Sequence, residues 1–232
     1  MARINKSTLT KLEIIRVASK MFLENGYSAT TIKAISKDLE MSTGNLTFYF
    51  PSKEHLLAEL VEIFCAFQWE LMSREADEGF SSLMAVCLEL TAIAAMCEDN
   101  PIAKDFYLAS YTSPMALEII RKNDTRRAMQ IFGPDLSHWT EEDFLSAEVL
   151  VSGIEYSTFM TTEGGPSLEA RITGALNLIM QVYHIPEDTR KMKIERVLSM
   201  DYRRIGSRVF WEFIQFVEQS NEQAIEALLQ MR

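Results

Sequence analysis

The sequence has few of the residues that build disulfide, metal or catalytic sites. Its 232 residues contain three cysteines and three histidines, and neither set has the paired spacing of metal ligands. The odd cysteine count predicts buried, reduced thiols in place of a disulfide framework. A glycine-rich phosphate loop and a nucleophile elbow are also missing. We therefore expect no enzyme, no metal site and no cofactor, with a chance spatial meeting of the histidines as the alternative.

Long apolar runs are missing as well. The longest run, from residue 83 to 97, is interrupted by Glu89 and is shorter than the ~20 residues needed to span a bilayer. No signal-peptide pattern precedes the first helical segment. The sequence therefore predicts a cytoplasmic protein that makes no membrane contact.

Positive charge is scarce everywhere except in the N-terminal part. The chain carries 23 Lys and Arg against 33 Asp and Glu, which gives a net charge of −10. Residues 1–53 hold 8 basic against 4 acidic side chains, whereas residues 54–232 hold 15 against 29. This balance argues against nucleic-acid binding over the whole surface, but it suits a basic head on an acidic body. We expect residues 1–53 to form a DNA-binding domain and residues 54–232 a larger second domain.

The apolar spacing is helical along the whole chain, which predicts an all-α fold. Near the N-terminus, Ser7 or Thr8 is expected to cap a first helix that Gly26 ends, and Thr30 or Thr31 to start a second. A third short helix is expected over residues 43–49. Because about three residues join the last two helices, the three together predict a helix-turn-helix head.

The larger domain carries further start and stop signals for helices. Starts are expected near Ser52, Ser81, Asn100 with Pro101, Ser113 with Pro114, Thr140 and Leu168. Breaks are expected at Pro186, at residues 199–201, and at Ser220 with Asn221. The sequence thus predicts two or three helices after residue 186.

The third helix has a buried side and an open side. Leu46 and Phe50 are expected to point inward, which leaves Gly44, Asn45 and Phe48 for a partner. Glycine allows close backbone approach, asparagine can form two hydrogen bonds with an adenine edge, and an aromatic ring can pack on a thymine methyl. Ser52 is expected to cap the next helix, which would place Lys53 at a helix N-terminus suited to phosphate.

The alternative is a three-helix knob that packs on a neighbour and never meets DNA. Leu46, Phe50 and Ile35 would be core residues under either interpretation. The knob leaves the local basic excess and the exposed Gly44, Asn45 and Phe48 face unexplained. We therefore favour DNA binding.

About residues 8–62 resemble the tetracycline-repressor (TetR) family. The resemblance rests on Ala18, Phe22, Gly26, Tyr27, Thr30, Thr31, Ile35 and the run from residue 42 to 54. It implies a homodimeric, all-helical transcriptional regulator, usually a repressor, with an N-terminal three-helix head on a larger helical domain for ligand binding and dimerisation. Its partners would be a double-stranded DNA operator and a small-molecule effector of unknown identity.

The resemblance also implies which residues contact DNA. These are Thr31, Ser42, Thr43, Gly44, Asn45, Thr47, Phe48, Tyr49 and Lys53, with Thr31 and Lys53 on phosphate. Two positions depart from the family pattern. Thr47 replaces a common tyrosine, and Glu40 replaces a glycine in the turn, where a left-handed backbone would cost roughly 1 kcal/mol.

An effector pocket is predicted from adaptable and aromatic side chains in the larger domain. The expected lining residues are Phe67, Met72, Met96, Phe106, Tyr107, Tyr111 and Tyr156. An ordinary apolar core is the alternative for each of them. The acidic composition suits a cationic ligand, with Glu70, Glu89 and Asp105 as candidate carboxylates, and solvated surface charges are the alternative.

A dimer interface is predicted from a helix that is apolar on two faces. In residues 168–184, one stripe contains Leu168, Ile172 and Leu176, and the opposite one contains Gly174, Leu178 and Val182. The second stripe needs a partner, and a helix hairpin that meets its twofold mate forms a four-helix bundle. The expected interface residues are Leu150, Ile154, Gly174, Leu178 and Val182, and a single buried core is the alternative.

Together these observations predict a DNA-binding transcriptional regulator. The first hypothesis is a repressor that a small-molecule effector releases from a palindromic operator. The second is a dimeric DNA-binding protein whose larger domain is structural or docks a protein partner.

Overall fold

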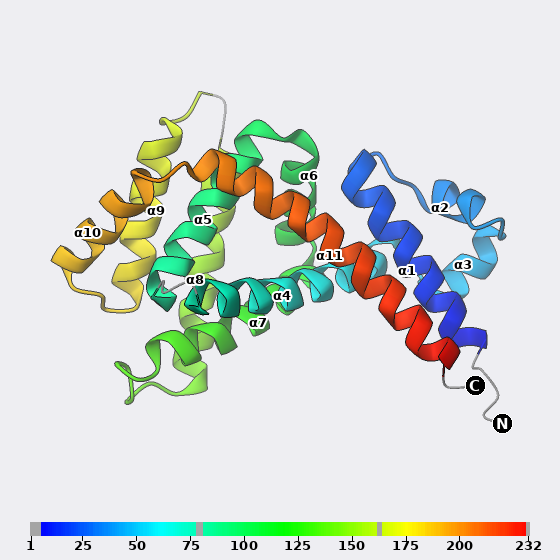
Figure 1. Cartoon of the computed structure of the whole chain (residues 1–232), viewed down its shortest axis with the longest axis horizontal. Helices are drawn as coiled ribbons and strands as arrows, with labels where there is room; N and C mark the ends of the chain where they lie inside the picture. The colour runs from blue at the N-terminus through cyan, green and yellow to red at the C-terminus, as the bar shows by residue number, and fades with distance from the viewer. Residues whose placement is uncertain (1–5, 78–80, 162–163, 231–232) are drawn as a thin grey trace.

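The chain folds into α-helices joined by short turns. A computed structural model describes residues 6–77, 81–161 and 164–230, and within these ranges it contains eleven helices and no strand. The expected all-α class is therefore confirmed. The helices (Figure 1) are α1 Lys6–Asn25, α2 Ile32–Asp38, α3 Thr43–Tyr49, α4 Lys53–Asp77, α5 Ser82–Asp99, α6 Pro101–Thr112, α7 Pro114–Phe132, α8 Glu141–Met160, α9 Leu168–Val182, α10 Glu187–Leu198 and α11 Tyr202–Gln230.

The head consists of α1, α2 and α3, and local signals set their ends. Gly26 has a φ of +93°, the left-handed conformation expected for the residue that ends α1. The Thr31 hydroxyl caps α2, and the Ser42 hydroxyl caps α3 by accepting the Asn45 N–H at 3.1 Å. The α3 bounds agree with the prediction. The prediction that Ser7 or Thr8 caps α1 was wrong, because α1 begins at Lys6.

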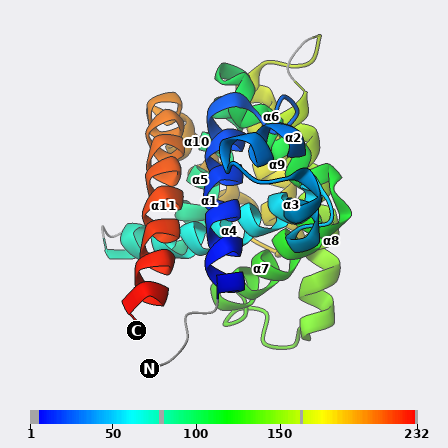
Figure 2. The same ribbon diagram turned by 90° about the vertical axis from the view of Figure 1, so that its right-hand side faces the viewer.

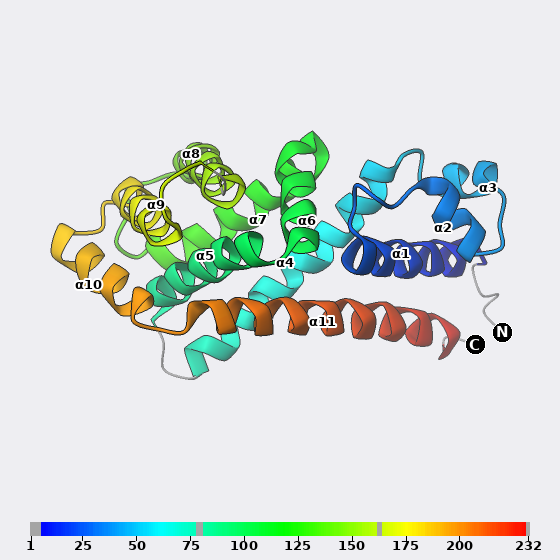
Figure 3. The same ribbon diagram turned by 90° about the horizontal axis from the view of Figure 1, so that it is seen from above.

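The body is built around α5. This helix is buried on most sides because its apolar residues, from Met84 to Cys97, are interrupted by few polar groups. Among the described residues, no helix is both long and apolar enough to cross a bilayer. The long helix α4 leaves the head and runs into the body beneath α5 and α7 (Figure 3).

Caps also define the helices that follow. Asn100 and Ser113 cap α6 and α7, each with a proline in the first turn. Thr140 caps α8 in a reciprocal arrangement with Asp143, whose carboxylate accepts the Thr140 N–H at 2.8 Å. These starts agree with the predicted ones. The next helix, α9, ends at Val182 and not at His184, which has a φ of +57°.

The last helix, α11, is continuous where the sequence predicts a break at Ser220 and Asn221. Asn221 is buried, and its side-chain amide donates a hydrogen bond to the Val217 carbonyl at 2.9 Å. The polar side chain is thereby satisfied inside the helix and does not end it. The predicted break was wrong for this reason. Only two helices, α10 and α11, follow residue 186 in the described residues.

Helix α11 joins the body to the head. It crosses α5 closely at Gly206, where an added Cβ would lie 2.5 Å from the Ala92 carbonyl oxygen. Its C-terminal half then lies beside α1 and antiparallel to it (Figures 2 and 3). Between these contacts, the Phe213 ring packs against those of Phe64, Phe67 and Phe106. One continuous core therefore extends from head to body, and the domain boundary at residue 53 stays a prediction.

Candidate nucleic-acid interface and buried cavity

Helix α3 presents the expected open face. Leu46 and Phe50 are buried, whereas Gly44 and Asn45 are exposed and the Phe48 side chain is 79% exposed. No atom of the described residues outside the local backbone lies within 4 Å of a Cβ placed on Gly44. Within the described residues the Asn45 side-chain amide makes no hydrogen bond, so its donor and acceptor are available to a partner. The arrangement can bring a backbone, an amide and an aromatic ring to one surface.

The other predicted contact residues surround this face. The hydroxyls of Thr31 and Ser42 are used as helix caps. Thr47 turns its hydroxyl back to the carbonyls of Thr43 and Gly44, at 3.0 and 3.2 Å. The Tyr49 ring is half-buried and lies edge-on to Phe48, with ring centroids 5.3 Å apart. Thr43 is exposed at the start of the helix. Contact of these residues with DNA stays a prediction.

Lys53 has a role that the sequence did not indicate. Its ammonium group donates hydrogen bonds to the carbonyls of Tyr27 at 2.9 Å and Thr30 at 3.1 Å. It also lies 4.0 Å above the centroid of the Tyr27 ring. Burial, with Glu54 and Asp105 nearby, raises the pKa of the Tyr27 hydroxyl to about 12. Lys53 thus ties the start of α4 to the loop between α1 and α2, with one N–H left for other contacts.

The turn before α3 contains a strained residue. Glu40 has a φ of +50°, the left-handed conformation that favours glycine. We expect Glu40→Gly to raise the free energy of unfolding by up to about 1 kcal/mol, because relief of strain outweighs the greater freedom of the unfolded chain. Urea unfolding provides the measurement. Glu40→Ala keeps the strain and removes the charge, so equal stability of the two variants would contradict this explanation.

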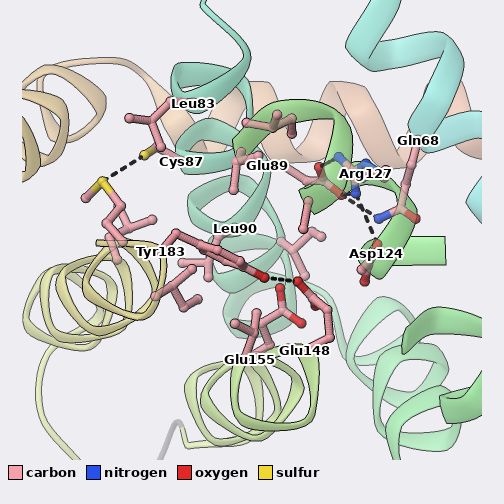
Figure 4. Close-up of a pocket in the computed structure, with 18 of the residues that line it drawn as sticks. Gln68, Leu83, Cys87, Glu89, Leu90, Asp124, Arg127, Glu148, Glu155 and Tyr183 are labelled. Carbon is pink, nitrogen blue, oxygen red and sulfur yellow. Dashed lines mark hydrogen bonds and ion pairs between the residues drawn. The ribbon is translucent and has the colours of Figure 1, made fainter. Parts of the chain in front are cut away.

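A cavity of about 60 Å³ lies inside the body, between α4, α5, α7, α8 and α9 (Figure 4). Its walls are largely apolar and aromatic, with Phe64, Phe132 and Phe159 among them. Titratable groups from four helices, and one from the residue after α9, reach the same space. These are Glu89, Tyr111, Asp124, Arg127, Glu148, Glu155 and Tyr183.

The residues predicted to line a pocket are distributed differently. Tyr111 lines this cavity, whereas Phe67, Met96 and Tyr107 line a smaller one of about 20 Å³ beside α11. Phe106 is fully buried in the aromatic core and lines neither cavity. Tyr156 is 37% exposed on the outside of α8 and also lines neither. The side chain of Met72 lies outside the described residues.

One side of the cavity contains a closed polar network. The Arg127 guanidinium pairs with the carboxylates of Glu89 and Asp124. Gln68 donates to Glu89 at 2.5 Å and accepts a hydrogen bond from Asn123 at 3.1 Å. Burial raises the pKa of the Asp124 carboxyl to about 6, although Arg127 opposes the change. The network holds α4, α5 and α7 together around the cavity.

The other side carries two carboxyl groups that the sequence did not single out. Tyr183 donates a hydrogen bond to Glu148, and Tyr111 donates one to Glu155 at 2.8 Å. Burial raises the pKa of the Glu148 carboxyl to about 8 and that of Glu155 well above its usual value. In the sequence, these two glutamates are seven residues apart, and this spacing indicates that they lie on the same face of a helix. Of the expected carboxylates, Glu89 lines the cavity; Glu70 is exposed.

Helices α8 and α9 lie side by side and present an open apolar face. Leu150 is 61% exposed and Leu178 51% exposed, with Ile154 and Val182 half-buried beside them. A Cβ added to Gly153 or Gly174 would meet no other part of the described chain within 4 Å, beyond its own helix backbone. The opposite stripe of α9, with Leu168, Ile172 and Leu176, is buried. The single chain thus covers one of the two predicted apolar stripes and leaves the other open.

The N-terminal region matches known regulators. The family model described as "Bacterial regulatory proteins, tetR family" matches residues 14–60. The HTH-type transcriptional regulator QacR of Staphylococcus aureus (strain Mu50) is 45% identical over 53 residues, 23% of this chain and 28% of that protein. The uncharacterized HTH-type transcriptional regulator YuxN of Bacillus subtilis (strain 168) is 39% identical over 51 residues, 22% of this chain and 18% of that protein. The chain thus matches less than a third of either relative.

Structural similarity extends over more of the chain. The crystal structure of RolR without ligand matches with a TM-score of 0.55 and 16% sequence identity, over 75% of this chain and 96% of that one. At this identity the similarity concerns the fold, a helix-turn-helix head on a helical body. Residues 14–60, which extend from within α1 to the first turns of α4, thus match the tetR family of bacterial regulatory proteins.

Proposed function

We propose that this protein is a dimeric repressor that reads an operator with α3 and is released by a small-molecule effector bound in its body. The observation that carries the proposal is the face of α3, where exposed Gly44, Asn45 and Phe48 stand over the buried Leu46 and Phe50. A helix held rigidly from behind, with small and amide groups in front, suits base recognition in the major groove.

Electrostatics supports this choice of surface. The excess of basic over acidic side chains is confined to residues 1–53, and the body is strongly acidic. A basic head attracts the phosphate backbone, whereas an acidic body repels it. DNA would therefore approach the end of the molecule that carries α3.

Two helices connect the cavity to the head. Helix α4 carries Lys53 against the head loop and Gln68 at the cavity. Helix α6 carries Tyr111 at the cavity and Asp105, whose carboxylate accepts hydrogen bonds from Ser28 of the head, from its backbone N–H at 2.7 Å and from its hydroxyl. An occupant that shifts either helix would move the head. Coupling of about 1–3 kcal/mol is usual for allosteric sites, and it acts equally in both directions.

The open face of α8 and α9 suits a second copy of the chain. A twofold four-helix bundle would cover Leu150 and Leu178, and the adjacent Gly153 and Gly174 leave room for close helix approach. The symmetry would then place two α3 helices on half-sites about one DNA turn, or a multiple of it, apart.

The prediction that α3 and Lys53 contact DNA is tested on an operator selected from random duplex DNA. We expect Asn45→Ala to relax preference at one base position, at a cost of roughly 1–3 kcal/mol, because the two-point contact with the base is lost. Lys53→Ala should weaken binding to all sequences, through loss of its anchoring bonds and of one phosphate contact. Fluorescence anisotropy against wild-type and single-base variant duplexes measures both effects.

An exposed change on α10, Glu195→Ala, is the control, because α10 lies at the far end of the molecule from α3. It should leave affinity and base preference unchanged. If a double variant with Asn45→Ala and Lys53→Ala binds the operator as tightly and as selectively as wild type, α3 is not the recognition helix.

The small volume of the cavity favours an alternative in which the body binds no small-molecule effector. At about 60 Å³ it is far below the ~300 Å³ or more of common ligand pockets. A body that is purely structural, or that docks another protein, would need no larger space. This alternative predicts operator affinity that does not respond to any small molecule that binds the chain.

A further inference from the structure

Glu148 and Glu155 of α8 have no positively charged partner in the part of the chain that the structure describes. Glu148 is 4% exposed, and its carboxyl group lies with that of Glu155 at the cavity (Figure 4). Within the described residues, no lysine, arginine or histidine forms an ion pair with either. Each accepts a single hydrogen bond, from the Tyr183 or the Tyr111 hydroxyl. A second oxygen on each carboxyl group therefore remains for an occupant of the cavity.

The one arginine of the cavity does not offset them. The Arg127 guanidinium already forms ion pairs with Glu89 and Asp124 on the opposite wall, so its charge is neutralised there. Four carboxyl groups thus share one cation in the lining. A buried carboxylate without a counter-charge is costly, and a cation in the cavity would remove that cost.

We propose that the cavity binds a small organic cation, an alkylammonium ion, whose charged end lies between Glu148 and Glu155 and whose carbon chain lies along the apolar wall. This inference rests on the proposed function and assigns a chemical class to its effector. The aromatic rings of Phe159, Tyr111 and Tyr183 line the same space and would face the positive end.

The cavity argues against other occupants. Among the residues that the structure describes, no three His, Cys, Asp or Glu side chains gather as metal ligands, which disfavours a bare metal ion. A polycyclic cation is too large, because even benzene occupies a cavity of about 150 Å³, and this one measures about 60 Å³. An anion would meet the four carboxyl groups. A short alkylammonium ion matches both size and charge.

The proposal predicts a proton-linked affinity. Burial raises the pKa of the Glu148 carboxyl to about 8, so the group is mostly protonated at pH 6 in the empty protein. A cation favours the ionised form, so binding releases a proton and strengthens as pH rises towards 8, by up to tenfold per pH unit. The charged and titratable groups that face Glu148 are Glu89 of α5, Tyr111 of α6, Asp124 and Arg127 of α7, Glu155 of α8 and Tyr183, which follows α9.

The test measures binding to the full chain by calorimetry and thermal shift at fixed chloride concentration. The probes are ethylammonium and n-propylammonium, with 1-propanol and propionate as the neutral and anionic counterparts. We expect the ammonium ions to bind and to raise the melting temperature, more strongly at pH 8 than at pH 6. Glu148→Gln and Glu155→Gln should each weaken them at least tenfold, whereas Glu142→Gln, an exposed change on the same helix, should not.

Operator binding is measured on the same samples. Glutamine can still accept the tyrosine hydrogen bonds, so normal operator affinity of the two cavity variants would show that they fold. The proposal is overturned if 1-propanol binds as tightly as n-propylammonium, or if no ammonium ion binds to protein that binds operator. Ammonium binding that leaves operator affinity unchanged would support the cation site and contradict the proposed release mechanism.

Discussion

Leu178→Arg should convert the protein from a dimer to a monomer and abolish tight operator binding at the same time. Leu178 lies in the middle of the open face of α9, beside Gly174 and Val182. In a twofold bundle, the arginine would be an uncompensated charge in a buried contact, at a cost of about 3–5 kcal/mol. Sedimentation at micromolar concentration measures the mass, and anisotropy on the full operator measures binding. A monomer presents a single α3 helix and loses the contribution of the second half-site.

Met192→Arg is a matched control for this change. Met192 is 57% exposed on α10, so it resembles Leu178 in size and exposure but lies outside the proposed interface. That variant should stay a dimer with normal operator affinity. A monomeric wild type, or a Leu178→Arg protein that remains a dimer, would place the interface elsewhere.

Gly206→Leu should destabilise the protein by about 3 kcal/mol and weaken operator binding. A Cβ at residue 206 would lie 2.5 Å from the Ala92 carbonyl oxygen and 3.2 Å from its carbon, and these backbone atoms cannot move aside as a side chain can. Helix α11 must therefore separate from α5. Because the same helix packs on α1, its displacement changes how the head is held. Chemical unfolding and operator titration report the two effects separately.

Gly206→Ala should show the same effects in weaker form, since its methyl group meets the same carbonyl with no further atoms behind it. Ser207→Ala alters the neighbouring exposed position of α11 and should change little. Wild-type stability of Gly206→Leu would mean that α5 and α11 can separate freely at this crossing. The packing of α11 on α5 would then have no effect on the position of the head.

Local signals in the sequence were sufficient for the head. Caps at Thr31 and Ser42 and the left-handed Gly26 depend on residues a few positions apart, so the pattern predicted the bounds of α3 and the outward side of Phe48. The apolar stripes of α9 followed in the same way from the helical repeat. These features need no knowledge of which helices meet.

Contacts between distant residues were beyond this reasoning. Lys53 was predicted as a phosphate anchor, which stays a prediction; the sequence did not indicate that its ammonium group also binds the carbonyls of Tyr27 and Thr30, which only the folding of α4 onto the head brings within reach. Asn221 resembles a helix break in isolation. It is buried where α11 meets α1, and its amide is satisfied within the helix.

The helical class, most helix ends and the open face of α3 could be predicted from sequence patterns, because helical period, caps and turn residues act over a few positions. Which side chains share a cavity depends on how distant helices pack. Glu89, Asp124, Glu148 and Glu155 come from three helices, and in the sequence they are four of many acidic residues. The packing of α5, α7 and α8 buries Glu148, partly buries the other three and leaves one arginine among them, and this desolvation makes the group a candidate cation site.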